Sequence, residues 1–180
     1  FFSDKKIILN SIKSKNKFLS KNLKVNILRE QIEQNLLFRE LDIKGASINS
    51  KEINSNDIFF AIKGKNNDGN LHLKEVLKKK ASLAIVSQID KKLNLKKQFK
   101  VKDPLKLLTN CSSILRENLP GKIIAITGSC GKTSLKELLG KTLRIFFKTS
   151  YSPKSFNNKF GVPLSLFNLN QKDDFGILEV

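Results

Sequence analysis

The 180-residue chain lacks several residue types and patterns, and each absence excludes a class of protein. Two cysteines, Cys111 and Cys130, are too few for the disulfide framework of a small secreted domain. No apolar run approaches the roughly 18 residues of a membrane span, and the N-terminal residues carry no signal-peptide core. Methionine is absent and the chain stops at Val180 inside an apparent strand, so we expect an internal fragment of a longer protein.

Acidic residues are also scarce, 16 against 34 lysines and arginines, which gives a net charge of +18. Such an excess favours a nucleic-acid partner. Direct reading of bases relies on arginine, however, and arginine occurs only at positions 29, 39, 116 and 144. The abundant residues lysine, asparagine, isoleucine and phenylalanine have A/T-rich codons, so genome composition explains the charge. We therefore expect no nucleic-acid partner, although a basic surface attracts anionic nucleotide substrates.

One segment, residues 122–134, predicts a ligand. The apolar run Ile123–Ile126 reads as a buried β-strand, and the glycine turn Gly128–Gly131 follows it. Lys132 then opens a predicted helix, whose apolar residues recur at helical spacing. These apolar residues are Leu135, Leu138, Leu139 and Leu143. Strand, glycine turn, Lys-Thr and helix form the arrangement that holds the phosphates of a nucleotide.

Each residue type in this loop has a chemical reason. Gly128 and Gly131 permit positive φ angles and let backbone amides approach phosphate oxygens. The first helical turn adds unpaired N–H groups, and Lys132 adds a full positive charge that makes it a predicted catalytic residue. Thr133 adds a hydroxyl for Mg²⁺, which prefers oxygen ligands. The predicted ATP-binding residues are Thr127, Gly128, Ser129, Cys130, Gly131, Lys132, Thr133 and Ser134.

The loop departs from the G-x-x-x-x-G-K-[ST] pattern because Ile126 stands where the first glycine would fall. The T-G-x-x-G-K-[ST] variant found here resembles the Mur ligases, ATP-dependent amide ligases of bacterial cell-wall synthesis. Residues 155–165, S-F-N-N-K-F-G-V-P-L-S, resemble the N-x-N-N-x-x-G-x-P-L-[ST] block of the D-alanyl-D-alanine-adding branch. Residues 48–64 resemble a further family block, and the resemblance covers about residues 27–180.

The resemblance implies an ATP-dependent amide ligase that adds D-Ala-D-Ala to UDP-N-acetylmuramoyl-tripeptide. In that family the substrate carboxylate attacks the γ-phosphate of ATP to form an acyl phosphate, and the incoming amine then displaces phosphate. The implied cofactors are ATP and Mg²⁺, and the implied partners are UDP-N-acetylmuramoyl-peptide and D-Ala-D-Ala, bound by a monomer. ATP use, free thiols and the missing export signal indicate the cytoplasm.

The resemblance also assigns roles to residues outside the loop. Glu179 ends the apolar run Phe175–Val180, a second predicted buried strand, and matches the family's Mg²⁺-binding glutamate. It is therefore a predicted metal ligand and catalytic residue, whereas by residue type alone it would be a strand-end glutamate paired with a lysine. The family's Asp-Ser-Arg appears here as Asn-Ser-Lys, and lysine lacks the planar fork of arginine. The predicted substrate-binding residues are Asn49, Ser50, Lys51, Asp68, Gly69, Asn157 and Asn158. His72, the only histidine, is assigned no role.

The predicted fold class is α/β, with a small N-terminal substrate domain followed by the first part of a P-loop domain that has a parallel sheet. The predicted divisions are residues 1–25 as a linker or the tail of a preceding domain, 26–102 as a UDP-substrate-binding domain, 103–120 as a connecting helix and 121–180 as the start of an ATP-binding central domain. Residues 1–8 resemble a segment near the C-terminal end of the diamino-acid-adding Mur ligases. A tandem fusion of two ligases is one hypothesis for this segment, and a basic linker is the alternative.

Periodicity and turn residues predict the remaining elements. They are a helix over 25–40, a strand over 58–62, a helix over 71–80, a strand over 83–86, a basic connector over 91–100, and a helix over 105–119 opened by Pro104. Two alternative functions remain open: a diamino-acid-adding or folylpolyglutamate-type relative, and a basic nucleic-acid-binding P-loop protein. The Asn-Asn block favours the D-alanyl-D-alanine-adding branch over the first of these.

Overall fold

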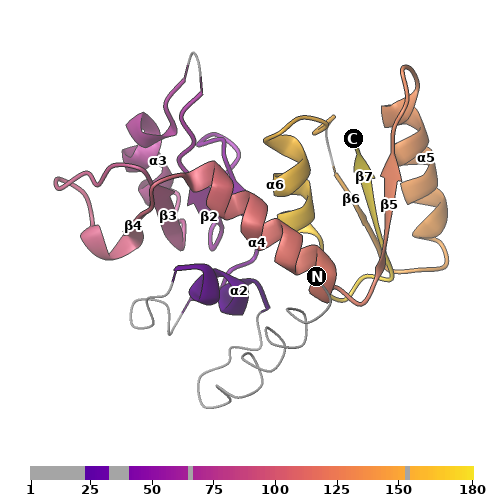
Figure 1. Cartoon of the computed structure of the whole chain (residues 1–180), viewed down its shortest axis with the longest axis horizontal. Helices are drawn as coiled ribbons and strands as arrows, with labels where there is room; N and C mark the ends of the chain where they lie inside the picture. The colour runs from indigo at the N-terminus through magenta and orange to yellow at the C-terminus, as the bar shows by residue number, and fades with distance from the viewer. Residues whose placement is uncertain (1–22, 33–40, 65–66, 153–154) are drawn as a thin grey trace.

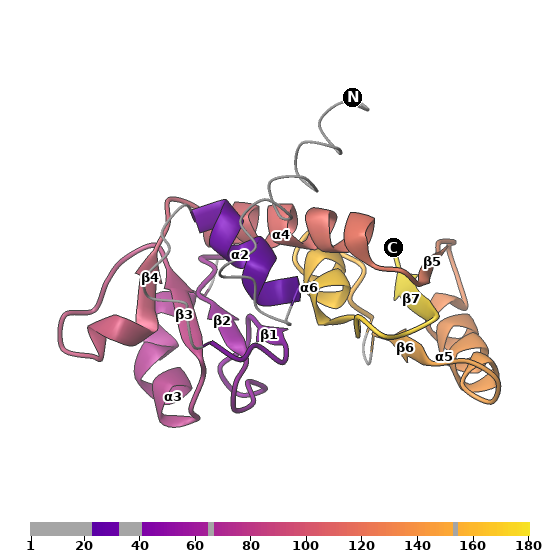
Figure 2. The same ribbon diagram turned by 90° about the horizontal axis from the view of Figure 1, so that it is seen from below.

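A computed structural model describes residues 23–32, 41–64, 67–152 and 155–180, and two β-sheets lie side by side in it (Figure 1). Helix α4 (Pro104–Asn118) runs from the first sheet towards the second, as Figure 2 shows from below. The predicted α/β class with parallel sheets is therefore confirmed. Within the described ranges, no helix combines the length and the apolar character that crossing a bilayer requires.

The first sheet has the strand order β1-β2-β3-β4 and is parallel throughout. Its strands are β1 (Ala46–Ser47), β2 (Ile58–Phe60), β3 (Leu83–Val86) and β4 (Gln98–Lys100). Successive side chains of a strand point to opposite faces. Ile58 and Phe60 join a core cluster with α2 (Leu23–Ile32) and α4, whereas Phe59 joins a second cluster with α3 (Leu73–Lys78). Because both faces are covered, the two central strands, β2 and β3, read as continuous apolar runs.

The connector predicted over residues 91–100 is wrong, because a 3₁₀ turn (Leu95–Lys97) and strand β4 occupy its second half. The side chain of Gln98 is buried, and its amide donates to the carbonyl oxygens of Asp90 at 3.0 Å and Asn94 at 3.3 Å. Phe99 packs into the core beside it. Since β4 lies at the edge of the sheet, its lysine-rich surroundings stay in solvent, and that composition conceals the strand.

The two helices predicted near the N-terminus are only partly matched. The helix predicted over 71–80 is α3, which spans Leu73–Lys78 and follows a 3₁₀ turn at Gly69–His72. The helix predicted over 25–40 corresponds to α2, which is described over Leu23–Ile32, and its remaining predicted residues, 33–40, lie outside the described residues. Residues 1–22, which carry the fusion hypothesis, also lie outside them, so that hypothesis stays a prediction.

Helix α4 begins at Pro104, as its sequence predicts. The Asp103 carboxylate accepts hydrogen bonds from the backbone N–H groups of Leu105 at 2.9 Å and Lys106 at 3.0 Å, and proline is tolerated in the first turn because its missing N–H would have no helical acceptor. Farther along, the Ser112 hydroxyl lies 2.7 Å from the carbonyl oxygen of Pro163 in α6 (Gly161–Asn168). Helix α4 thus packs against α6 as well as against α2 and β2 of the first sheet.

Lys24 of α2 is one of the few charged side chains in the core, with an exposed fraction of 4%. Its Nζ donates to the carbonyl oxygen of Lys44 at 3.1 Å and lies 5.5 Å from the centre of the Phe167 ring in α6. Burial lowers the pKa of Lys24 to about 8, and the nearby Asp57 carboxylate opposes that shift. This lysine therefore connects α2 both to the segment that precedes β1 and to α6.

The second sheet has the order β5-β7-β6 and is also parallel. Its strands are β5 (Lys122–Ile126), β6 (Thr149–Tyr151) and β7 (Phe175–Glu179). Strand β7 is buried as predicted, but the prediction that β5 is buried is wrong, because only Ile126 is fully covered. Strand β5 is an edge strand whose one partner within the described residues is β7, so the rest of it remains half-buried or exposed.

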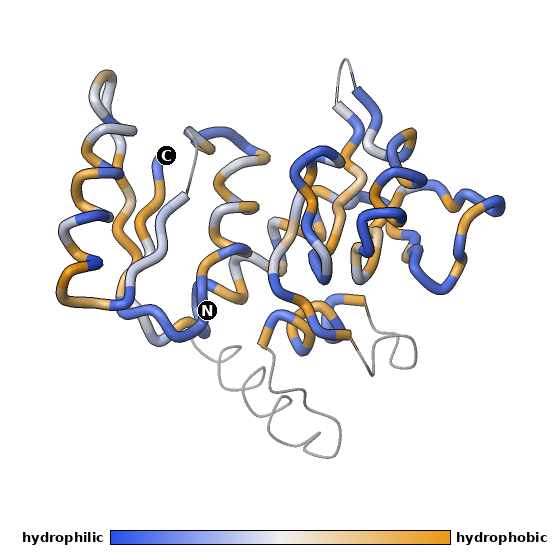
Figure 3. Tube along the Cα trace, turned by 180° about the vertical axis from the view of Figure 1, so that it is seen from behind, coloured by the Kyte–Doolittle hydropathy of each residue, from blue (hydrophilic) through white to orange (hydrophobic). Residues whose placement is uncertain are grey.

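Helix α5 (Lys132–Leu143) forms where the sequence predicts it but buries a different face. Leu135 and Leu138 are 52% and 65% exposed, whereas Lys136 and Gly140 are buried against the sheet. Hydrophobic and hydrophilic positions alternate along this helix (Figure 3). Glycine is required at 140 because a Cβ there would overlap the ring of Tyr151. The apolar spacing predicted the helix correctly without identifying its buried side.

Candidate nucleotide-binding site

The glycine turn between β5 and α5 has the backbone that a phosphate-binding loop needs. Gly128 and Gly131 have φ angles of +147° and +73°, which L-residues with a side chain rarely adopt. The first helical hydrogen bond of α5 runs from the N–H of Leu135 to the carbonyl oxygen of Gly131 at 2.9 Å. The N–H groups before it have no acceptor within the helix, so they are available to an anion.

Lys132 folds back along this turn. Its Nζ donates to the carbonyl oxygen of Gly128 at 2.6 Å, which places the ammonium group beside the glycine backbone. The loop from Thr127 to Gly131 is exposed to solvent, so a phosphate group can approach it directly. The predicted ATP-binding residues are therefore contiguous and accessible.

Glu179 lies at the same edge of the sheet as the glycine turn. Strands β5 and β7 are parallel neighbours, and Ile126 pairs with Glu179 in their register. Carboxyl ends of parallel strands are where open α/β sheets bind ligands. Glu179 is only 3% exposed, so its carboxylate needs partners inside the protein.

The Glu179 carboxylate has hydrogen-bond donors on both oxygens. The Thr133 hydroxyl donates to Oε2 at 2.9 Å, and the Asn157 amide donates to Oε1 at 3.0 Å. Thr133 Oγ1 also lies 3.0 Å from the hydroxyl oxygen of Ser155. The structure thus brings together three residues that the sequence analysis took from separate motifs, Thr133, Asn157 and Glu179.

Lys136 is a neighbour of this cluster that the sequence analysis missed. Its Nζ lies 3.7 Å from Glu179 Oε2, and its side chain is completely buried. The available signal was its position four residues after Lys132, which places both side chains on one side of the helix. A lysine at that spacing is also typical of an exposed helix face, so the pattern alone did not distinguish the two.

The donor set around Glu179 suits a hard divalent cation. Mg²⁺ takes oxygen ligands and is often held by one or two protein groups together with substrate phosphates. The Thr133 hydroxyl and the Glu179 carboxylate are two such groups, already in contact at the start of α5. Among the described residues no group of three or more His, Cys, Asp or Glu side chains is placed to hold a metal ion. The residues present therefore fit a cation that arrives with a nucleotide.

The second asparagine of the predicted pair has a different position from the first. The side-chain oxygen of Asn158 accepts from the N–H groups of Phe160 at 3.0 Å and Gly161 at 2.9 Å, at the start of α6. Its side chain is thus engaged in capping the local backbone. Its role as a substrate contact stays a prediction.

The predicted substrate residues after β1 are held by a local network. The Ser50 hydroxyl donates to Glu75 of α3 at 2.8 Å, and Lys79 Nζ donates to the carbonyl oxygens of Ser50 at 2.8 Å and Lys51 at 3.0 Å. Hydrogen bonds to its carboxylate lower the pKa of Glu75, and the bond from Ser50 contributes more than the bond from Lys79. Asn49 donates to Glu52 at 3.0 Å. This segment is ordered by its own contacts, with Asn49 exposed.

Asp68 and Gly69 also have clear structural contacts. Asp68 accepts from the backbone N–H of Asn70 at 2.9 Å and from its side-chain amide at 2.7 Å, and these bonds lower the pKa of Asp68. A Cβ on Gly69 would lie 2.8 Å from Cα of Ala61, so glycine allows the turn to pack directly on the backbone after β2. Their predicted substrate contacts remain predictions.

Comparison with known proteins finds relatives of this part of the chain. Residues 126–180 match the family model described as the Mur ligase middle domain, which spans the end of β5, the glycine turn and Glu179. Residues 126–180 belong to the Mur ligase family. The match begins at the last residue of β5 and includes all of the predicted ATP-binding residues.

Individual Mur ligases resemble a larger part of the chain. A UDP-N-acetylmuramoyl-tripeptide–D-alanyl-D-alanine ligase of Buchnera aphidicola is 31% identical over 140 residues, which are 78% of this chain and 30% of that enzyme. A UDP-N-acetylmuramoyl-L-alanyl-D-glutamate–2,6-diaminopimelate ligase of Rickettsia rickettsii is 39% identical over 116 residues, 64% of this chain and 24% of that enzyme. The crystal structure of MurF ligase from Thermotoga maritima in complex with ADP is 30% identical with a TM-score of 0.61, covering 78% of this chain and 32% of that one. The chain therefore spans about a third or less of the length of these Mur ligases.

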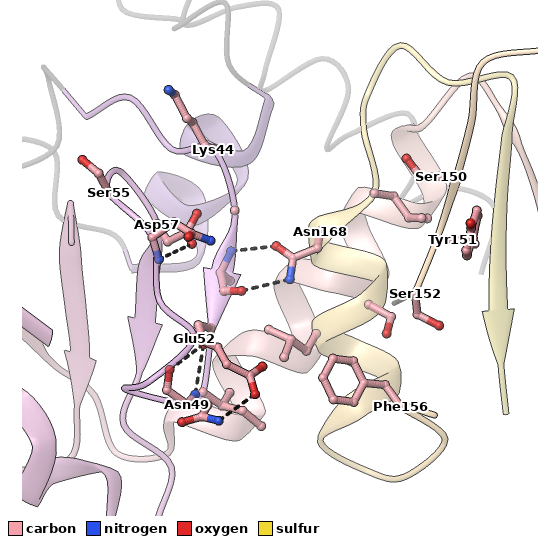
Figure 4. Close-up of a pocket in the computed structure, with 18 of the residues that line it drawn as sticks. Lys44, Asn49, Glu52, Ser55, Asp57, Ser150, Tyr151, Ser152, Phe156 and Asn168 are labelled. Carbon is pink, nitrogen blue, oxygen red and sulfur yellow. Dashed lines mark hydrogen bonds between the residues drawn. The ribbon is translucent and has the colours of Figure 1, made fainter. Parts of the chain in front are cut away.

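A cavity of about 690 Å³ lies between the first sheet and the segment from β6 to α6 (Figure 4). Lys44, Asn49 and Asp57 line it from the side of the first sheet, and Tyr151 and Phe156 line it from the other side. Asn49 is the one predicted substrate residue in its wall, and the glycine turn does not reach it. The predicted substrate residues from Asn49 to Gly69 thus belong to the part of the chain around the first sheet, whereas Asn157 contacts Glu179 beside the glycine turn.

Asn168 attaches helix α6 to the first sheet at the wall of the cavity. Its amide donates to the carbonyl oxygen of Ala46 at 2.9 Å and its carbonyl accepts from the N–H of Ala46 at 2.7 Å, so it pairs with β1 as a neighbouring strand would (Figure 4). The contact is close, because a Cβ on Gly45 would lie 2.8 Å from Asn168 Oδ1. One side chain thus pairs with both backbone polar groups of Ala46 at the edge of the first sheet and fixes α6 against it.

Replacing Asn168 with alanine is expected to lower the free energy of unfolding of the complete protein by about 1–3 kcal/mol, because both polar groups of Ala46 lose their partners. Asn168→Asp should be at least as destabilising, since a carboxylate would face the Ala46 carbonyl oxygen. Urea-induced unfolding measures both changes. Asn110→Ala, at an exposed position of α4, is the matched control and should stay within about 0.5 kcal/mol of wild type. If Asn168→Ala had the same free energy of unfolding as wild type, the contact of Asn168 with Ala46 would not stabilise the fold.

Proposed function

We propose that the protein containing this chain is an ATP-dependent amide ligase that adds D-Ala-D-Ala to UDP-N-acetylmuramoyl-tripeptide. The observation that supports it most is the contact of Thr133 with Glu179 directly beside the glycine turn, which sets two oxygen ligands next to a phosphate-binding backbone. Asn157, from the block that resembles the D-alanyl-D-alanine-adding branch, completes the contact on the other carboxylate oxygen. The use of ATP favours the cytoplasm as the site of this reaction.

The chain's own residues would act by binding and charge neutralisation. The amides of the glycine turn and the first turn of α5 would bind the β- and γ-phosphates, and Lys132 would stabilise negative charge on the transferring phosphoryl group. Thr133 and Glu179 would hold Mg²⁺, which neutralises phosphate charge when bound. The substrate carboxylate attacks the γ-phosphorus and ADP leaves. The amine then attacks the acyl carbon of the acyl phosphate, loses a proton and displaces inorganic phosphate, so a poor leaving group has been replaced by a good one.

The substrate would be bound on the side of the first sheet. We propose that residues 26–102 form the UDP-substrate-binding domain, 103–120 the connecting helix and 121–180 the start of the central domain. Asn49, Ser50 and Lys51 follow the carboxyl end of β1, the position at which parallel sheets bind ligands. Asp68, Gly69 and Asn158 are proposed to complete the substrate contacts.

The proposed function is tested by product formation with the complete protein. ATP, UDP-N-acetylmuramoyl-tripeptide and D-Ala-D-Ala should give the pentapeptide product in a mass spectrum, with one phosphate released for each amide formed. UDP-N-acetylmuramoyl-dipeptide with diaminopimelate is the competing pair, and product from that pair alone would assign the protein to the other branch. Thermal stabilisation by a random oligonucleotide, without any by the UDP-linked substrate, would favour a nucleic-acid-binding protein instead.

A further inference from the structure

The buried carboxylate of Glu179 requires a compensating positive charge. Its exposed fraction is 3%, and an isolated buried carboxylate is strongly unfavourable. Thr133 and Asn157 donate hydrogen bonds to it but are neutral. Lys136 contributes the one ion pair to Glu179 found among the described residues, with 3.7 Å between Nζ and Oε2.

The two lysines of α5 face different groups. Lys132 is partly exposed and its Nζ contacts the Gly128 carbonyl oxygen at 2.6 Å, beside the loop where phosphate would lie. Lys136, one helical turn later, has no exposed surface and reaches Glu179 from the interior of the protein. Because its side chain is fully buried, Lys136 is not placed to contact a ligand that approaches the loop from solvent.

We propose that Lys136 is a positioning residue that serves as the built-in counter-ion of Glu179. Its ammonium group holds the carboxylate at the end of β7, against Thr133, before a nucleotide binds. It also reduces the attraction of the carboxylate for a divalent cation that arrives alone. A cation that arrives with nucleotide phosphates also brings their negative charge to the site, so the Lys136 ammonium group opposes its binding less. This metal-related part rests on the proposed function, whereas the pairing itself does not.

The pairing is tested by a double-mutant cycle in the complete protein, measured by thermal unfolding in buffer with a chelator. Lys136→Met should lower the unfolding midpoint by on the order of 5–10 °C, since it leaves Glu179 buried without its counter-ion. In the Glu179→Gln background the same change should cost less than about half as much. Lys141→Met, at an exposed position of the same helix, should leave the midpoint unchanged. Equal losses in both backgrounds would reduce Lys136 to a packing residue and overturn the proposal.

If Lys136→Met does not fold, Lys136→Gln provides a milder change for the same cycle. Folding of the double variant together with failure of Lys136→Met would itself support the coupling, because removal of the second charge restores the protein. Failure of both, or a cycle with Lys136→Gln that shows no coupling, would contradict it.

The effect on the cation is tested with Mg²⁺ alone. Millimolar Mg²⁺ without nucleotide should raise the midpoint of Lys136→Met by about 3–5 °C and that of wild type by about 1 °C or less, because the uncompensated carboxylate attracts the cation. Equal shifts would overturn this part. Neither measurement uses a substrate or turnover. A negative ligase assay and a negative result for the pairing of Lys136 with Glu179 can therefore be told apart.

Discussion

Replacing Lys132 with alanine is expected to abolish ATP-dependent phosphate release by the complete protein. The substitution removes the side-chain charge beside the glycine turn, and stabilisation of transition-state charge by one such group is worth about 10²–10³-fold in rate. The hydrogen bond that is lost, to the Gly128 carbonyl oxygen, is exposed to solvent, so the fold should persist. Phosphate release at saturating ATP, UDP-linked tripeptide and D-Ala-D-Ala measures the loss.

Lys141→Ala is the matched control for this experiment. It removes the same kind of charge from an exposed position of the same helix, so its rate should equal that of wild type. Turnover of Lys132→Ala within a few-fold of wild type would exclude the role of Lys132 in phosphoryl transfer. An unchanged circular dichroism spectrum would show that any loss arises at the site.

Glu179→Gln is expected to lower turnover by on the order of 10²-fold, because a neutral amide replaces the carboxylate proposed to hold Mg²⁺. The side chain keeps its size, and its carbonyl oxygen can still accept from Thr133, so the loss should come from the charge. The Mg²⁺ concentration for half-maximal phosphate release should rise as well. A titration of Mg²⁺ at fixed ATP measures both quantities.

Glu137→Gln provides the comparison for Glu179→Gln, since it removes a carboxylate from a half-buried position of α5 that has no part in the proposed site. Its turnover and its Mg²⁺ dependence should match wild type. An unchanged Mg²⁺ dependence of Glu179→Gln would show that Glu179 is an ordinary buried strand-end glutamate. That was the alternative interpretation of the residue by its type alone.

Local signals predicted the larger part of the fold. Helix α4 begins at Pro104 because Asp103 caps it, and both residues are recognisable in the sequence. Strand β3 is a four-residue apolar run that is buried on both faces. Strand β4 was missed, because its burial depends on β3 as a partner and on Gln98 contacts with the preceding turn. The burial of β5 was overestimated from its apolar sequence. The burial of a strand depends on its neighbours, and among the described residues β5 has one neighbouring strand, β7.

The site was predicted as separate motifs, and its assembly was not. The contact of Thr133 with Glu179 joins residues 46 positions apart, and that of Asn157 with Glu179 joins residues 22 apart. Lys136 reads as one lysine among many in a chain with a net charge of +18. Its burial becomes visible only when β7 lies beside α5.

The sequence by itself determined the glycine turn, the charge of Lys132 and the order of strand and helix around them, because backbone conformation and spacing over a dozen residues encode these features. The tertiary structure alone decided that Lys136 faces Glu179 and that Asn168 pairs with Ala46. Those contacts join parts of the chain that are distant in sequence. Packing of whole elements, which no local pattern specifies, brings them within hydrogen-bonding or ion-pairing distance.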